Sequence, residues 1–181
     1  QRICKTFNEH FIMGKLDILN GKIAFNKKEF NNAIQYYETG LDRIQISDNQ
    51  YYIMLYSAEQ AIHYLYQRNY RKCKIFIDKA LFITEKIKNE DAQIYINCIK
   101  ELLLTLENND DVNRLDILVK QLDKVEGINR YICWWFISLS YKKLMQMDKS
   151  DISLTKAREE LDMVVSAIAD SIDKVTFINK S

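Results

Sequence analysis

The sequence contains no proline and only 4 glycines among its 181 residues. Sandwiches and barrels of β-strands use both residues heavily in their turns, so an all-β fold is excluded. The glycines are also too far apart to form a glycine-rich phosphate-binding loop. These absences leave an all-α fold as the expected class.

The chain also lacks a charge imbalance, a metal-ligand pattern and a long apolar run. Its 26 basic and 25 acidic residues nearly cancel, whereas a dedicated nucleic-acid binder normally has a basic face. The two histidines, His10 and His63, have no partner at the spacing of a metal site. No apolar run approaches the length of a membrane helix, so we expect no membrane association. From the balanced charge and the missing metal-ligand pattern we expect no direct nucleic-acid contact and no cofactor.

The four cysteines, Cys4, Cys73, Cys98 and Cys133, form no CxxC pair, and each falls in an apolar helical stretch. Buried, reduced thiols are therefore expected, which favours a cytoplasmic location. The first residues do not resemble a signal peptide and include no initiator methionine, so we expect a fragment of a longer protein.

Two segments, 21–41 and 61–81, align without a gap. In both, a small residue ends one apolar stretch, a polar turn follows, and an aromatic residue begins the next stretch. A second small residue, a bulky residue and a leucine then recur at helical spacing, as close packing of two helices requires. The matching residues are Gly21, Phe30, Ala33, Tyr37 and Leu41 in the first segment and Ala61, Tyr70, Cys73, Ile77 and Leu81 in the second.

Two weaker copies follow, with Leu115 and Ala157 at the second small position. The spacings between these positions are nearly constant: 73 − 33 = 40, 115 − 73 = 42 and 157 − 115 = 42. The fourth copy requires an insertion at about 147–153. The sequence therefore predicts one domain, residues 1–181, with repeats at about 10–48, 50–89, 91–126 and 128–170.

This pattern resembles the tetratricopeptide repeat, a helix–turn–helix unit. The resemblance implies an α–α superhelix, or solenoid, with longer helices than usual, as in kinesin light chains and Rap-type peptide receptors. The tryptophan of the family's first helix is missing from the first two repeats, and its closing proline is missing throughout. Asn49 and Asn89 are expected to make the turns instead, because asparagine tolerates turn geometry.

The apolar periodicity predicts helices bounded by polar turns. Asp48, Asp91 and Asp110 are expected to favour helix starts, and Gly127 a helix end. The tail resembles the closing segment of bacterial tetratricopeptide sensory regions, with a capping helix at 172–178. The other expected helices are 6–26, 30–46, 50–67, 70–88, 91–107, 111–125, 128–147 and 153–170.

No catalytic arrangement is recognisable, so we do not expect an enzyme. Ser138 and Ser140 have no histidine near them in the sequence. Cys133 lies in an apolar run, whereas reactive thiols need polar, partly exposed surroundings. In Glu159–Glu160, adjacent residues point to different sides of a helix.

The resemblance instead implies a non-enzymatic scaffold that binds a protein or peptide in a concave groove formed by the first helix of each repeat. It would serve as the interaction or sensor region of a larger bacterial regulator, for example of transcription. Ile18 and Lys22 do not match the family's carboxylate clamp, so chaperone-tail binding is not expected. The groove residues implied by the resemblance are Lys22, Phe25, Asn26, Ile62, Leu65, Tyr66, Asn97, Lys100 and Tyr141.

Two alternatives remain open from the sequence. One is a signalling-peptide receptor of the Rap or pheromone-regulator type, in which asparagine side chains pair with a peptide backbone. The other is a self-associating assembly module, a homo-oligomer whose contact patch is the exposed aromatic tract Trp134–Phe136.

Overall fold

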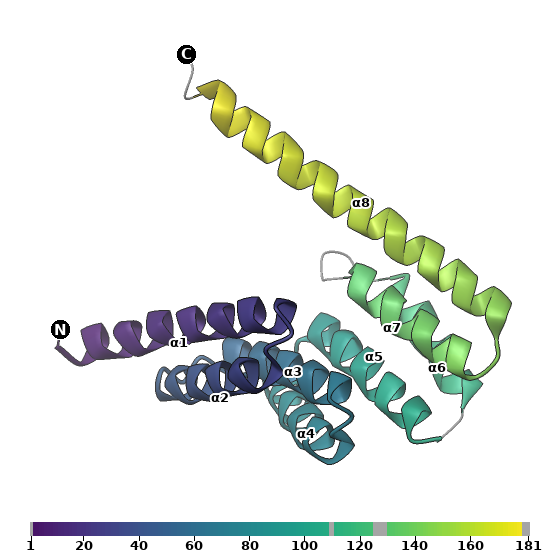
Figure 1. Ribbon diagram of the computed structural model, residues 1–181, viewed down its shortest axis with the longest axis horizontal. Helices are drawn as coiled ribbons and strands as arrows, with labels where there is room; N and C mark the ends of the chain where they lie inside the picture. Colours follow the sequence, from purple (N-terminus) through teal and green to yellow (C-terminus); the bar gives the residue numbers. More distant parts are fainter. Residues whose placement is uncertain (1, 109–110, 125–129, 179–181) are drawn as a thin grey trace. The chain divides into compact units, whose positions relative to one another are not determined.

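The computed structural model describes residues 2–108, 111–124 and 130–178, with side chains described between residues 7 and 167 of these ranges. Its described residues form eight α-helices and no strand (Figure 1), which confirms the all-α class. The helices are α1 (Arg2–Asn26), α2 (Phe30–Ile46), α3 (Gln50–Tyr66), α4 (Tyr70–Ile87), α5 (Glu90–Leu106), α6 (Val112–Leu122), α7 (Arg130–Lys143) and α8 (Met147–Ile178).

Backbone packing divides the chain into two compact units, Gln1–Leu103 and Leu104–Ser181. In the first unit, α1 packs along α2 and α3 along α4, and α2 also contacts α3. In the second, α7 packs along α8 and contacts α6. Figure 1 shows the close pairs α1–α2 and α7–α8 within their own units. Helices that follow one another therefore pack as antiparallel hairpins, which is consistent with a helical repeat.

A residue in the left-handed conformation reverses the chain at each described turn, and none of these residues is glycine. The amide after the left-handed residue bonds the carbonyl five positions earlier, at 2.9 Å in both Glu29–Ala24 and Asn69–Tyr64. This bond satisfies a carbonyl that would otherwise be left free at the helix end. The left-handed residues of the first five turns lie 20 apart (48 − 28 = 20, and so on): Lys28, Asp48, Arg68, Lys88 and Asn108.

Asparagines begin the next helix in three of these turns. The side-chain oxygens of Asn49, Asn69 and Asn89 accept a bond from the backbone amide three residues later, at 3.3, 3.2 and 2.9 Å. Asn49 and Asn89 thus shape the turns as expected, but as N-caps rather than as the left-handed residues.

The acidic residues expected at helix starts have different places. Asp91 lies in the first turn of α5, as expected. Asp48 is instead the left-handed residue before Asn49. Asp110 and Gly127 lie outside the described residues.

The small positions of the first three repeats, Ala33, Cys73 and Leu115, are buried as the alignment predicts. The fourth, Ala157, is also buried, but α8 begins at Met147 rather than 153, so Ala157 does not lie three positions into its helix as the other three do. The residue three positions into α8 is Ser150, which is buried and donates its hydroxyl to the Ser138 carbonyl at 3.0 Å. The last spacing is therefore 150 − 115 = 35, and no insertion is present.

Two further expectations about the second unit are wrong. The helix α8 runs without a break to Ile178, so no separate helix forms at 172–178. In the tract Trp134–Phe136, Trp134 and Phe136 are buried, so it is part of the core and not an exposed patch. The expectation of buried thiols is confirmed for Cys73, Cys98 and Cys133.

In the first hairpin, α1 and α2 approach closely where two glycines face each other. A Cβ added to Gly40 would lie 2.8 Å from the backbone oxygen of Gly14 and 2.9 Å from the side chain of Ile18. The backbones leave no room for even a methyl group, so this contact sets the distance between the helices.

Gly40→Ala is expected to destabilise the protein by about 1–2 kcal/mol, because the clash with the α1 backbone exceeds the roughly 1 kcal/mol gain in helix propensity. Urea denaturation measures this change. Thr39→Ala, at the exposed neighbouring position, is the control and should leave stability within about 0.5 kcal/mol. Equal stability of the two variants would contradict the close approach.

Lys88 ends α4 with φ 52° and ψ 47°. Lys88→Gly is expected to raise the free energy of unfolding by about 0.5–1 kcal/mol, because glycine adopts this conformation without a steric cost. Lys74→Gly, in the exposed middle of the same helix, should lower it by about 1 kcal/mol. Thermal melts of both variants that shift in the same direction would refute the assignment of the turn.

Candidate functional site

Within the first unit, α1 and α3 are joined by side chains along their length. Lys22 Nζ lies 2.8 Å from Glu59 Oε1. The Phe25 ring centre is 4.2 Å from that of His63 and 5.4 Å from that of Tyr66. Towards the other end of α1, Lys15 Nζ lies 5.0 Å from the centre of the Tyr52 ring.

These contacts show that α1 and α3 run in the same direction. In each contact, the residue of α3 follows its partner on α1 by a nearly constant number of positions in the sequence, as in 59 − 22 = 37 and 66 − 25 = 41. Two parallel helices thus present a shared surface to solvent. We call this surface the α1–α3 face and define it by Lys15, Lys22, Phe25, Tyr52, Glu59 and Tyr66.

On α3, Gln60 and His63 are buried and Glu59 is half-buried; we call these three polar residues the polar cluster. Gln60 is 1 % exposed, and neither its amide nitrogen nor its amide oxygen has a hydrogen-bond partner. Glu59 Oε2 and His63 Nδ1 are likewise buried without a partner. An unpaired buried polar group costs about 1–3 kcal/mol, so a hydrogen-bonding partner at these atoms would stabilise the helix pair.

Burial controls the electrostatics of the polar cluster. It raises the pKa of Glu59 even though the nearby Lys22 ammonium acts in the opposite direction. Burial, helped by the charge of Lys22, lowers the pKa of His63 to about 4. The pKa of Tyr56 rises to about 12, first through burial and then through repulsion from Glu59. His63 is therefore neutral at pH 7.

The rings of Phe25 and Tyr37 enclose His63, each with its centre 4.2 Å from the imidazole. The described residues contain no group of three or more His, Cys, Asp or Glu side chains arranged to hold a metal ion. The polar cluster with its aromatic surroundings therefore offers hydrogen-bonding and apolar contacts.

The structure brings several of the expected groove residues together on the first unit. Lys22 and Asn26 are exposed on α1, and Phe25 between them is half-buried. Tyr66 is 50 % exposed at the end of α3. Ile62 is half-buried and Leu65 is buried, so they contribute mainly to packing.

The remaining expected residues belong to other helices. Asn97 and Lys100 are half-buried on α5. Tyr141 belongs to the second unit and is only 2 % exposed. Its hydroxyl donates to Asp116, which Lys149 also binds at 2.7 Å. The contacts of Tyr141 and Lys149 with Asp116 therefore join α6, α7 and α8. Because the Tyr141 side chain is buried, it leaves little surface for a partner.

Glu59 and Gln60 were not anticipated as site residues. The available signal was their position within the otherwise mostly apolar stretch 53–65. A charged residue in such a stretch requires a partner. The partner of Glu59 is Lys22, which lies far upstream in the sequence (59 − 22 = 37).

None of the described helices is both long enough and apolar enough to cross a membrane. Comparison of the chain with protein-family models, with curated proteins and with solved structures finds no match.

The lowered pKa of His63 predicts a loss of stability in acid. Between the ordinary pKa of 6.5 and the folded value of about 4, the unfolded chain binds a proton on this residue more readily than the folded protein. The free energy of unfolding should therefore fall by about 3 kcal/mol through His63 as the pH drops across this window, with little further change below it. The raised pKa of Glu59 acts in the opposite direction in acid.

Urea denaturation of the wild-type protein and His63→Phe, between pH 7 and pH 4, isolates the contribution of His63. Phenylalanine keeps the contact with Phe25 and Tyr37 and cannot take up a proton. The variant should gain stability relative to the wild type as the pH falls, whereas a constant difference between the two proteins would refute the burial of a neutral histidine.

Proposed function

We propose that this protein is a non-enzymatic scaffold with a tetratricopeptide-like superhelix, and that its α1–α3 face binds a peptide segment of a protein partner. The observation that carries the proposal is the grouping of Lys22, Phe25 and Tyr66 on one surface, although they come from two helices. Aromatic rings combined with hydrogen-bonding side chains are typical of surfaces that bind peptides.

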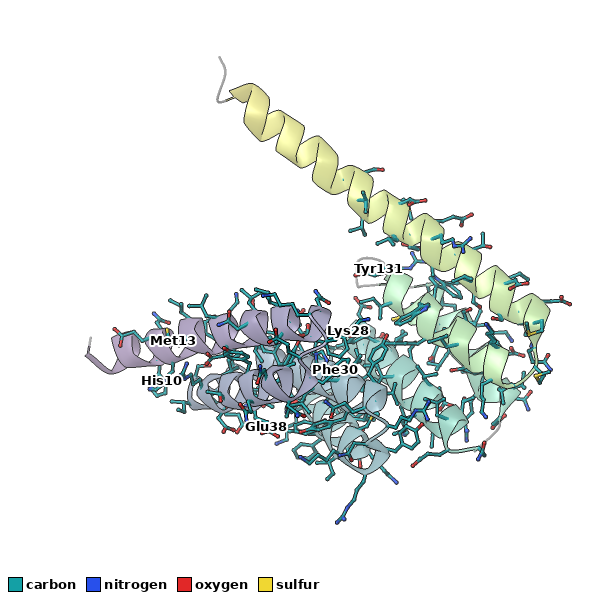
Figure 2. The ribbon with its side chains drawn as sticks, in the orientation of Figure 1. His10, Met13, Lys28, Phe30, Glu38 and Tyr131 are labelled. Atoms are coloured by element: carbon teal, nitrogen blue, oxygen red, sulfur yellow. The ribbon has the colours of Figure 1, made fainter. Side chains whose placement is uncertain are left out.

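The superhelix is supported by stacking of the second helices as well as the first. Glu38 on α2, labelled in Figure 2, accepts a hydrogen bond from the Tyr64 hydroxyl at 2.9 Å. Lys72 Nζ on α4 lies 4.0 Å from the same carboxylate. The separation in sequence of this α2–α4 contact, 72 − 38 = 34, is close to that of the contacts between α1 and α3. Equivalent helices of the first two hairpins are thus neighbours, as in a repeat stack.

The α1–α3 face favours an extended peptide with an apolar side chain. Such a side chain would pack against Phe25 and Tyr66, and the exposed amide of Asn26 would pair with the peptide backbone. Lys22 is held by Glu59 and offers its remaining ammonium hydrogens to a partner acceptor. We further propose that this binding serves as the interaction or sensor step of a larger cytoplasmic regulator.

Selection of peptides from a random displayed library, followed by calorimetry of the best binders, tests the proposal. The variant Asn26→Ala with Tyr66→Ala removes one polar and one aromatic side chain, and it leaves Lys22 in place because Lys22 compensates the buried carboxylate of Glu59. Its affinity should be at least about tenfold lower, since truncating one aromatic anchor typically costs more than about 1 kcal/mol.

The matched control is Lys86→Ala with Phe82→Ala on α4. In this exposed pair, Lys86 Nζ lies 4.2 Å from the centre of the Phe82 ring. The control should bind the selected peptides as the wild-type protein does. Selected peptides that bind the α1–α3 variant at full strength, or that lose affinity for the α4 variant, would contradict the proposed site.

A further inference from the structure

A second apolar surface lies on another side of α1. Ile12, Leu16, Leu19 and Ile23 are 57, 47, 52 and 53 % exposed. Their spacing of four, three and four positions places them in one line along the helix. At about 100° per residue, this line is opposite to the buried Gly14, Ile18 and Gly21 that face α2. We call these four residues the α1 stripe.

Polar residues flank the α1 stripe in a paired arrangement. Glu9 and Lys27 are both exposed, and their positions differ by 27 − 9 = 18. At about 3.6 residues per turn this separation makes five full turns, so both side chains lie on the same flank. The other flank carries the exposed Asn8 and Asn26, whose positions differ by the same amount, 26 − 8 = 18.

These positions are symmetric about one point of the helix. The midpoint of the α1 stripe lies between residues 17 and 18. The midpoint of the Glu9 and Lys27 pair is residue 18, and that of the Asn8 and Asn26 pair is residue 17. Figure 2 labels Met13 near the middle of α1 and Lys28 just beyond the end of the helix. A helix with this pattern is complementary to its own copy turned end for end.

In an antiparallel pair of such helices, residues of the same flank meet across the contact. Glu9 of each copy would then face Lys27 of the second copy, and Asn8 would face Asn26. A parallel pair would bring Glu9 to the level of Glu9 and Lys27 to the level of Lys27. The charges therefore favour the antiparallel arrangement, in which an isologous contact closes with two copies.

We propose that the α1 stripe is a self-association surface, on which α1 packs antiparallel against α1 of a second copy of this chain. Between Glu9 and Lys27 the helix is about 27 Å long, and its row of four large aliphatic side chains would form the apolar centre. This contact is centred on a different side of α1 from the α1–α3 face and shares only Asn26, at its edge, with the proposed peptide site, so it goes beyond the proposed peptide binding and is argued from other observations.

Sedimentation equilibrium across a range of concentrations tests the proposal. The mass is expected to rise from the monomer value of 21.5 kDa towards twice that value. Leu16→Lys with Leu19→Lys should keep the protein monomeric. The control, Ile75→Lys with Phe82→Lys, changes two α4 side chains of similar exposure, 56 and 58 %, and should leave association unchanged.

A charge exchange distinguishes the antiparallel contact from other modes of association. Glu9→Lys alone, and Lys27→Glu alone, each place like charges at both ends of the contact and should weaken self-association about tenfold. An equimolar mixture of these two variants restores both opposite-charge pairs and should associate about as strongly as the wild type. All these changes are at exposed positions, and circular dichroism verifies that helicity is kept.

A monomer at every concentration would overturn the proposal and would mean that something other than a second copy covers the α1 stripe. Association that survives the Leu16 and Leu19 changes, or that is lost in the α4 control, would overturn the assigned surface. Failure of the mixed charge variants to associate would overturn the antiparallel arrangement.

Discussion

Reversal of the chain in very short turns, which use neither glycine nor proline where the structure describes them, is the constraint on which the regularity of this structure depends. Each described turn places a residue such as Lys28 or Arg68 in the left-handed conformation, at a cost of about 1–2 kcal/mol. Hydrogen bonds to the end of one helix and, in three turns, an asparagine cap on the next offset this cost. Helices of nearly equal length follow, with 17 residues in α2 and α3 and 18 in α4.

Equal helices bring equivalent positions of neighbouring hairpins together. Lys22 reaches Glu59, and Phe25 reaches His63 and Tyr66, because α1 and α3 are parallel and their equivalent positions lie at similar levels. The same geometry buries the polar cluster beneath the surface that these side chains form. Polar atoms without a partner within the protein thus lie close to the surface proposed to bind a partner, as is common where function competes with packing.

Much of the helical pattern was predictable from the sequence. The bounds of α2, α3 and α4 agree with the expected ranges within one residue, because polar turns separate strongly periodic apolar stretches. The start of α8 was not predictable, because the alignment matches Ala157 with the small residues of the other repeats, whereas Ser150 holds the equivalent place in its helix. A serine reads as polar in a sequence, yet here its hydroxyl bonds the Ser138 carbonyl inside the core.

The site was less predictable than the fold. The resemblance placed Lys22, Phe25 and Tyr66 on one surface, and they are brought together in the structure. The same resemblance named Tyr141, whose hydroxyl instead binds Asp116 within the second unit. Neither that contact nor the burial of Glu59 follows from periodicity, because each depends on a partner from a distant helix (141 − 116 = 25 and 59 − 22 = 37).

The pairing of each helix with its neighbour along the chain also affects how the protein acquires its structure. The closest packing joins α1 to α2, α3 to α4 and α7 to α8, so most tertiary interactions form between segments that are close in sequence. Such a low contact order keeps the entropy of loop closure small and permits folding within about microseconds to milliseconds. Any hairpin is able to serve as the nucleus from which order spreads to its neighbours.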